Sequence, residues 1–254
     1  MEEDTAVRAT SFGAIAEDYD RYRPGPPPAA ADWLLPGGAS LVADVCAGTG
    51  GLTRILDGRV QTVVAVELDR RMLAVLAGGV PEAAAVCANG EILPFRPASL
   101  DAVLISSAWH WLDPAIAAAE IGRVLRPGGV LGVVWSGPDR SVAWIADLLG
   151  PSRWTSPAPP VPPASGRSRR SLVLPATAPF HDPERQLIEW SLPRTRQELV
   201  GLAGTYSRVI TQGPAERLEI ARRAAQVIDG DPAFAGTDAV EVPMASVCWR
   251  AVRR

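Results

Sequence analysis

The feature that most constrains the fold is a strand–helix alternation that runs from residue 40 to residue 136. Continuous apolar runs of strand length, such as "SLVADVC" and "TVVAVEL", alternate with segments of helical periodicity, such as "RRMLAVLAGG". Strands that are apolar throughout are buried on both faces, and parallel strands need helical crossovers between them. The pattern therefore predicts a parallel sheet with helices on both faces.

Seven strands are expected in all. Five follow from the alternation and two more lie in the C-terminal third, over residues 40–46, 62–68, 83–90, 100–107, 130–136, 185–192 and 238–253. Helices are expected over residues 51–58, 70–79, 113–125, 194–210 and 214–228. The last helix and strand follow each other without a crossover, so the sheet is expected to end in an antiparallel pair. The fold class is a doubly wound, mostly parallel α/β sheet of the Rossmann-like type.

Two segments depart from this strand–helix alternation. A short helix over residues 9–22 is stopped by "RPGPPP", and residues 150–179 are dense in Pro, Ser and Arg, which predicts an inserted flexible loop. We expect one domain over residues 1–254. Its parts are an N-terminal helical lid (1–36), a core (37–150), the insert (151–180) and C-terminal helices and strands (181–254).

Composition narrows the function. The net charge of −3 gives no argument for nucleic acid or an anionic membrane, and the absence of lysine excludes Schiff-base chemistry and a P-loop. Three cysteines without CxxC spacing predict reduced thiols and no metal site. The acidic N-terminus is unlike a signal peptide, and no apolar run reaches about 18 residues. We expect a cytoplasmic monomer or homodimer.

The stretch "VADVCAGTGGLTRIL" predicts a ligand site. A strand that ends in Asp44, a Gly-rich turn and a helix N-terminus together bring backbone N–H groups close to a nucleotide-like ligand. A dinucleotide fingerprint would need a third glycine where Thr53 stands. An NAD-dependent oxidoreductase therefore remains only an alternative.

The series D-x-C-x-G-x-G resembles motif I of class I S-adenosylmethionine (SAM) methyltransferases. "VAVELDRRML", "ANGEILPF" and "RPGGVLGVVW" resemble the later landmarks of that family, in the same order. "SFGAIAEDYDRYRPGPP" and "AWHWLD" are similar to segments of a bacterial small-molecule subgroup, the type 11-like methyltransferases. The resemblance implies methyl transfer from SAM, which leaves S-adenosylhomocysteine, to a small-molecule acceptor.

The resemblance also implies the site. In it, Glu67 holds the ribose hydroxyls, and the cofactor-binding residues are Tyr19, Arg23, Asp44, Cys46, Ala47, Gly48, Gly50, Glu67, Leu68, Met72, Asn89, Gly90 and Ser106. Cys46 replaces the first glycine of the motif, and Asn89 replaces an aspartate that contacts adenine. Because Cys is larger than Gly, either the turn opens slightly or the thiol points away from the methionyl group.

Each assignment has a structural alternative. Asp44 could cap the next helix, Met72 could be core packing, and Tyr19 and Arg23 could belong to an ordinary amphipathic helix. His110 is the candidate general base on the loop after the fourth strand, or a structural histidine.

Trp109 and Trp111, with the Pro-rich insert, would form an apolar pocket for an apolar or aromatic acceptor. Cys46 favours the main rival function, a protein of the same fold that does not transfer methyl.

Overall fold

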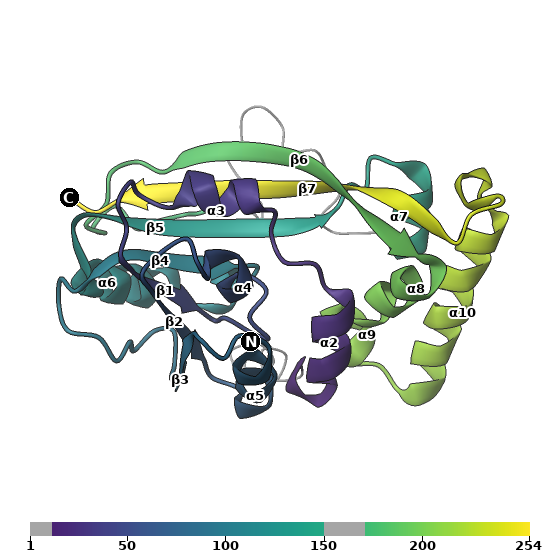
Figure 1. Cartoon of the computed structure of the whole chain (residues 1–254), viewed down its shortest axis with the longest axis horizontal. Helices are drawn as coiled ribbons and strands as arrows, with labels where there is room; N and C mark the ends of the chain where they lie inside the picture. Colours follow the sequence, from purple (N-terminus) through teal and green to yellow (C-terminus); the bar gives the residue numbers. More distant parts are fainter. Residues whose placement is uncertain (1–11, 150–170) are drawn as a thin grey trace. The chain divides into compact units, whose positions relative to one another are not determined.

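A seven-stranded sheet organises the chain (Figure 1). The structure, a computed structural model, describes residues 12–149 and 171–254. The strand order is β3-β2-β1-β4-β5-β7-β6. The strands are β1 (Leu41–Val45), β2 (Thr62–Glu67), β3 (Ala84–Cys87), β4 (Leu100–Ser106), β5 (Leu125–Pro138), β6 (Glu184–Thr195) and β7 (Ala239–Val252).

The sheet is parallel from β3 to β5 and antiparallel at its C-terminal end. Val42 pairs with Val63 of β2 and with Ala102 of β4, both in parallel register. Directly after β7, Arg253 accepts a backbone hydrogen bond from Gly128 N and donates one to the Gly129 carbonyl, in the antiparallel manner. The predicted fold class is therefore confirmed.

Helices fill the connections between the strands. They are η1 (Phe12–Ile15), α2 (Ala16–Tyr22), α3 (Pro28–Leu34), α4 (Thr53–Leu56), α5 (Arg70–Gly79), η2 (Trp109–Trp111), α6 (Pro114–Val124), α7 (Ala143–Leu149), α8 (Arg196–Gly204), α9 (Ser207–Ile210), α10 (Pro214–Gly230) and η3 (Pro232–Phe234). Local signals explain several starts. The Asp69 side chain caps α5, that of Asp113 caps α6 before Pro114, and α8 begins with a capping box from Thr195 and Glu198.

Three elements differ from the sequence prediction. β5 begins at Leu125, five residues before the expected start, because the "RPGG" segment joins the strand, with a register shift where β4 pairs with it. The helix expected over 194–210 is two helices, divided at Thr205 and Tyr206, where the buried Thr205 hydroxyl donates to the Leu202 carbonyl. Helix α7 was not predicted.

The described chain forms two compact units. The sheet unit contains residues 24–136, 171–188 and 246–254, and the helical unit contains residues 12–23, 137–149 and 189–245. The predicted N-terminal lid, residues 1–36, therefore contributes residues to both units. That residues 1–254 are a single domain stays a prediction.

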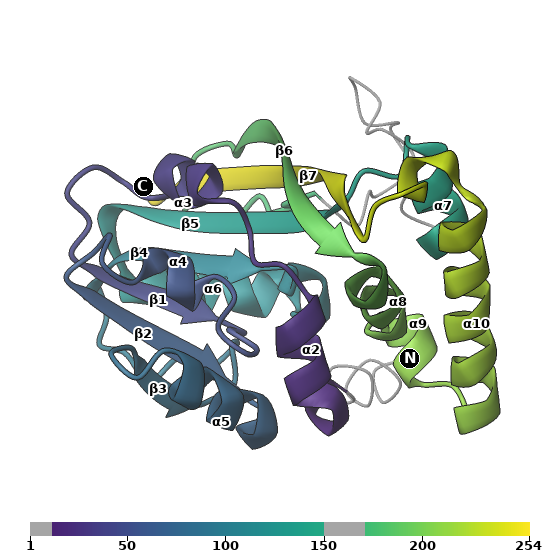
Figure 2. The same ribbon diagram turned by 45° about the vertical axis from the view of Figure 1, so that its right-hand side comes forward.

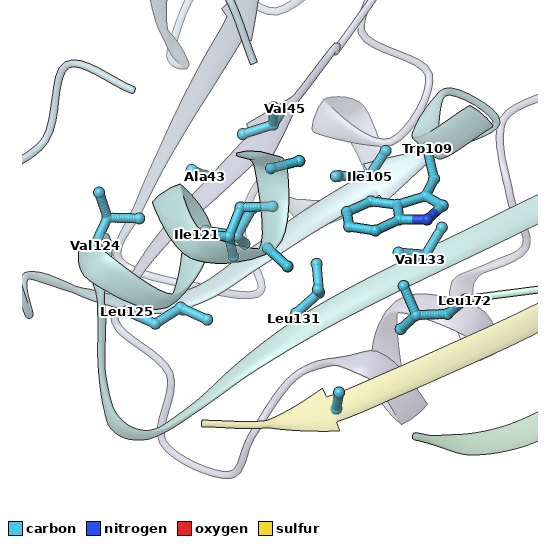
Figure 3. Packing of buried hydrophobic residues seen from close by; sticks show 14 of the residues in the cluster. Ala43, Val45, Ile105, Trp109, Ile121, Val124, Leu125, Leu131, Val133 and Leu172 are labelled. Atoms are coloured by element: carbon cyan, nitrogen blue, oxygen red, sulfur yellow. The ribbon is translucent and has the colours of Figure 1, made fainter. Parts of the chain in front are cut away.

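In the sheet unit, successive side chains of a strand pack on opposite faces of the sheet. Side chains at alternate positions of β1, β4 and β5, such as Ala43, Ile105 and Leu131, pack with α6 (Figure 3). The intervening positions, such as Val42 and Leu104, pack on the other face with α3 and α4. In Figures 1 and 2, α5 lies beside β2 and β3, in contact with both strands. Burial on both faces explains why these strands are apolar throughout.

The end of the predicted Pro-rich insert belongs to this core. Leu172, Ala178 and Phe180 are buried in the cluster that contains α6. A Cβ at Gly122 of α6 would lie 2.4 Å from Cγ of Pro179, so this glycine allows the segment to lie directly on the helix. Residues 171–180 are therefore packed, contrary to a flexible loop, and residues 150–170 lie outside the described residues.

The helical unit has a core of its own, in which α7, α8 and α10 pack with β7. Helix α2 belongs to this unit and lies on α8, where a Cβ at Gly201 would lie 2.6 Å from the ring of Tyr22. In the parts of the chain that the structure describes, no helix is long and apolar enough to cross a membrane.

Candidate functional site

The Gly-rich turn after β1 has a left-handed backbone at three alternate residues. The φ angles are +57° at Cys46, +59° at Gly48 and +88° at Gly50. A Cβ at Gly50 would lie 2.9 Å from Cγ of Leu76, so α5 packs closely against the turn and both the angle and the space require glycine. The turn exposes backbone at the carboxyl edge of the sheet, where ligands of open α/β sheets bind.

Cys46 occupies its left-handed position with the thiol turned into the protein. A Cβ at Gly90 would lie 3.1 Å from the Cys46 Sγ atom and 3.0 Å from Cγ1 of Val45. Cys46 also packs against the main core cluster. Burial raises the pKa of the thiol well above its usual range, so it stays neutral. Gly90 after β3 thus makes room for the residue that replaces the motif glycine.

Glu67 ends β2 and is oriented by backbone N–H groups. Its Oε2 atom accepts a hydrogen bond from Gly48 N (2.9 Å), and its Oε1 atom accepts one from Asp69 N (2.9 Å). The half-buried carboxylate therefore joins the turn after β1 to the end of β2. Each oxygen can accept a further hydrogen bond, because a carboxylate offers about four acceptor positions.

Asp44 is the most perturbed carboxyl group of the site. It is fully buried in β1, and the Thr53 hydroxyl donates to its Oδ2 atom at 2.6 Å. Within residues 12–149 and 171–254, its Oδ1 atom has no hydrogen-bond partner. Burial raises the pKa of Asp44 to about 7, and the nearby charge of Glu67 adds to the increase, against the lowering effect of Thr53.

Thr53 is a residue of this site that the sequence reasoning did not assign. It stands where a dinucleotide fingerprint would have its third glycine, and it is fully buried. Its hydroxyl is committed to Asp44. The spacing in the sequence allows this contact, since a threonine at that position can donate a hydrogen bond back to an aspartate near the end of the strand.

Two apolar side chains flank the turn. Leu68 follows Glu67 and is 55% exposed, whereas Met72, in the first turn of α5, is buried. A Cβ at Gly48 would be 3.6 Å from the Met72 terminal methyl group, so Met72 lies under the turn. Asn89, after β3, is exposed, and its Oδ1 atom accepts from Glu91 N at 2.9 Å. That oxygen, predicted to meet adenine, retains one acceptor position.

The end of β4 and the loop after it place Ser106, Trp109, His110 and Trp111 at the same edge, because β4 is parallel to β1. Trp109 is only 3% exposed and packs in the core, as Figure 3 shows. Its place in the acceptor pocket stays a prediction. Trp111 is half-buried, and its ring centroid lies 4.6 Å from that of His110.

His110 accepts a long hydrogen bond, 3.5 Å, at Nδ1 from the Nε1 atom of Trp135 on β5. A neutral imidazole that accepts at Nδ1 carries its proton on Nε2. Trp135, 4% exposed, was not assigned to the site from sequence, because the contact joins the loop after β4 to β5, between residues 25 positions apart.

Tyr19 and Arg23, the other predicted cofactor residues, lie in the helical unit. Arg23 lies over the rings of Tyr19 and Tyr206 and donates from Nε to the Thr205 hydroxyl at 2.9 Å. Their place at the cofactor stays a prediction. In the sheet unit, Gly25 contacts the turn itself, since a Cβ there would lie 2.5 Å from the Gly51 carbonyl oxygen.

Known proteins share this arrangement. The family described as a methyltransferase domain matches residues 43–133, which include the Gly-rich turn, Glu67 and the loop after β4. A methyltransferase of Mycobacterium tuberculosis, named as uncharacterized, is 39% identical over 244 residues, 95% of each chain.

Two solved structures share the fold. A protein from Anaeromyxobacter dehalogenans, assigned as a type II methyltransferase, is 23% identical to this chain. Its structure has a TM-score of 0.62 over 91% of this chain and 98% of that one. A phosphoethanolamine N-methyltransferase of Haemonchus contortus, bound to S-adenosylhomocysteine, is 14% identical, with a TM-score of 0.56 over 100% of this chain and 60% of that one. The chain belongs to the methyltransferase family.

Proposed function

We propose that this methyltransferase binds SAM at the carboxyl edge of β1 and β2 and methylates a small-molecule acceptor whose reacting part is apolar or aromatic. The observation that carries the cofactor assignment is the geometry of Glu67. Backbone N–H groups of Gly48 and Asp69 fix its carboxylate, and each oxygen keeps an acceptor position. A fixed anion at a strand end is suited to two ribose hydroxyls, which donate charge-assisted hydrogen bonds.

Asp44 supports the same location. A buried carboxyl oxygen without a hydrogen-bond partner costs about 1–3 kcal/mol, and a donor supplied by the ligand would recover part of that cost. A cationic donor would also lower the pKa of Asp44 from about 7 and fix the charged form. The cofactor carries such donors at its amino acid end.

The apolar contacts fit a nucleoside base. We propose that the exposed Leu68 flanks adenine, with Met72 beneath the turn, while backbone at Ala47 and Gly90 approaches the ligand. Asn89, after β3, and Ser106, at the end of β4, would complete the polar contacts. Tyr19 and Arg23 are kept as predicted contacts of the aminocarboxypropyl end.

SAM supplies a methyl group that its sulfonium already activates, so the protein needs mainly to orient the acceptor and exclude water. We propose Trp111 as the apolar wall of the acceptor site. His110 would donate from Nε2 to the acceptor, because Trp135 occupies Nδ1. The predicted role of general base would require a change of tautomer and the loss of that hydrogen bond.

The direction of the Cys46 thiol bears on the rival function, a protein of this fold without methyl transfer. Replacement of the motif glycine was the argument for that function. The thiol packs against the core beside Gly90, so it does not fill the turn, and this supports cofactor binding.

Calorimetric titration with S-adenosylhomocysteine, SAM and NAD tests the proposal. We expect micromolar affinity for the first two, on the order of −8 kcal/mol. Glu67→Ala should weaken binding by about 1.5–3 kcal/mol, because it removes charge-assisted hydrogen bonds. Glu82→Ala, which removes an exposed carboxylate of the same unit, is the control and should leave the affinity unchanged. Binding of NAD alone, or equal affinities in both variants, would contradict the proposal.

The cytoplasmic location, the monomeric or dimeric state and the absence of nucleic-acid partners stay predictions from the sequence.

A further inference from the structure

Strand β6 forms one edge of the sheet (Figure 1). Its 12 residues make it longer than most strands of globular proteins. In the strand order of the described residues, β7 is its only neighbour. The outer side of such a strand presents a row of backbone donors and acceptors, to which a strand of another chain can pair.

The two faces of β6 differ in their surroundings. Ile188 and Leu192 pack against core clusters on one face. Arg185, Leu187 and Glu189 alternate with them and are exposed, with 47% of Leu187 accessible to solvent. Within residues 12–149 and 171–254, neither Arg185 nor Glu189 forms an ion pair. We call Arg185, Leu187 and Glu189 the edge triplet.

The edge triplet is complementary to itself in the antiparallel direction. If a second copy pairs with β6 about a two-fold axis perpendicular to the sheet, equivalent side chains lie on the same face, so the axis passes through one residue. An axis at Leu187 places Arg185 of each copy opposite Glu189 of the other, and it places the two Leu187 side chains opposite each other. Pairs of opposite charge and apolar pairs stabilise neighbouring strands when they lie directly opposite.

The neighbouring registers lack this complementarity. An axis at Glu189 sets two carboxylates opposite each other, and an axis at Arg185 sets two guanidinium groups opposite each other. Like charges in such positions destabilise the pairing of strands. An axis at either residue adjacent to Leu187 sets that leucine opposite a charged side chain. The side-chain pattern therefore favours the Leu187 axis.

We propose that a second copy of this chain pairs antiparallel with β6 about a two-fold axis at Leu187, so that the sheet continues from one copy into the other. Residues 184–190 pair in this arrangement. They lie between Pro183 and Pro193, neither of which can donate a backbone hydrogen bond to a ladder. The proposal is independent of the cofactor assignment, because the edge triplet includes none of the residues assigned to the cofactor.

Reversal of the two charges tests the pairing in the full-length protein. Analytical ultracentrifugation at rising concentrations gives the dissociation constant of the dimer. Arg185→Glu and Glu189→Arg should each raise it by about tenfold or more, because the symmetry converts two attractive pairs into two repulsive ones. The double variant exchanges the charges and should return the constant to within about threefold of the wild-type value. Glu82→Arg, at an exposed position far from β6 in the sequence, is the control and should change the constant by less than about twofold.

Disulfide cross-linking tests the register. In a Cys87→Ser background, which removes an exposed thiol, Leu187→Cys should form a covalent dimer under mild oxidation, because directly opposite side chains lie close enough for a disulfide. Ser191→Cys, on the same exposed face, is the matched control. Its two copies would lie about 27 Å apart along the strands. Circular dichroism of every variant shows whether it is folded.

Several results would overturn the proposal. A wild-type protein that stays monomeric at every concentration would mean that the charges of the edge triplet only keep the edge solvated. A dimer that is insensitive to the charge reversals, or one that the double variant does not restore, would place the interface on another surface. Equal rates of cross-linking in Leu187→Cys and Ser191→Cys would contradict the Leu187 axis. The two reversals change the net charge in opposite directions, so a general effect of charge on association cannot weaken the dimer in both.

Discussion

Replacing Asp44 by asparagine should remove a pH-dependent loss of stability. Burial raises the pKa of Asp44 from 3.8 to about 7, so the folded protein keeps a proton that the unfolded chain has released. For a carboxyl group whose pKa is raised on folding, stability is greatest below the unfolded pKa, falls as the pH rises, and becomes constant above the folded pKa. These two pKa values give a loss of about 2.5 kcal/mol between about pH 5 and about pH 8.

Urea unfolding, followed by tryptophan fluorescence, measures this pH-dependent loss of stability. Free energies of unfolding are compared for the wild type and Asp44→Asn across that pH range, so that titrations common to both proteins cancel. The wild type should lose about 2.5 kcal/mol more than Asp44→Asn as the pH rises. Asp57→Asn, at an exposed position of the same unit, is the control and should follow the wild type.

Parallel losses of stability in the wild type and Asp44→Asn over the whole pH range would contradict this prediction. Such a result would mean that Asp44 is charged in the folded protein at about pH 5. Affinity provides a second comparison. If Oδ1 accepts from the cofactor, Asp44→Asn should bind S-adenosylhomocysteine more weakly by about 1–3 kcal/mol, despite its smaller loss of stability at high pH.

Two other substitutions test the packing. Gly201→Ala should push α2 away from α8, because its Cβ would lie 2.6 Å from the Tyr22 ring. Trypsin should then cleave after Arg21 faster than in Gly204→Ala, where the Cβ meets nothing within 4 Å, and equal cleavage rates would contradict this. Gly50→Ala should destabilise the protein by about 2–4 kcal/mol in urea unfolding, since strain at positive φ adds to a clash with α5, and a loss below about 1 kcal/mol would mean that the turn adjusts freely.

Much of the fold could be predicted because its signals are local. Helix α5 extends over the predicted residues, since apolar spacing and the Asp69 cap agree. The buried strands β1, β2 and β4 were recognisable as apolar runs of strand length. Helix α7 has only seven residues, and its buried residues belong to the core of the helical unit, so the segment was too short to be recognised from its sequence.

In the site too, local features could be predicted from the sequence and tertiary contacts could not. The Gly-rich turn and Glu67 follow from motif spacing, but the contacts that decide their chemistry are tertiary. The hydrogen bond from Trp135 to His110 and the packing of Cys46 beside Gly90 each join different strand ends. Trp109 carries the same motif signal as Trp111, yet only the packed structure shows that it is buried.

The most direct test of the cofactor assignment is a crystal structure of the protein with S-adenosylhomocysteine. We expect both ribose hydroxyls to lie within about 3.2 Å of the Glu67 carboxylate oxygens. The adenine ring should lie against Leu68, and Asp44 Oδ1 should accept a hydrogen bond from the ligand. Density for the ligand away from the carboxyl edge of β1 and β2, or ribose hydroxyls bonded to another acidic residue, would contradict the account.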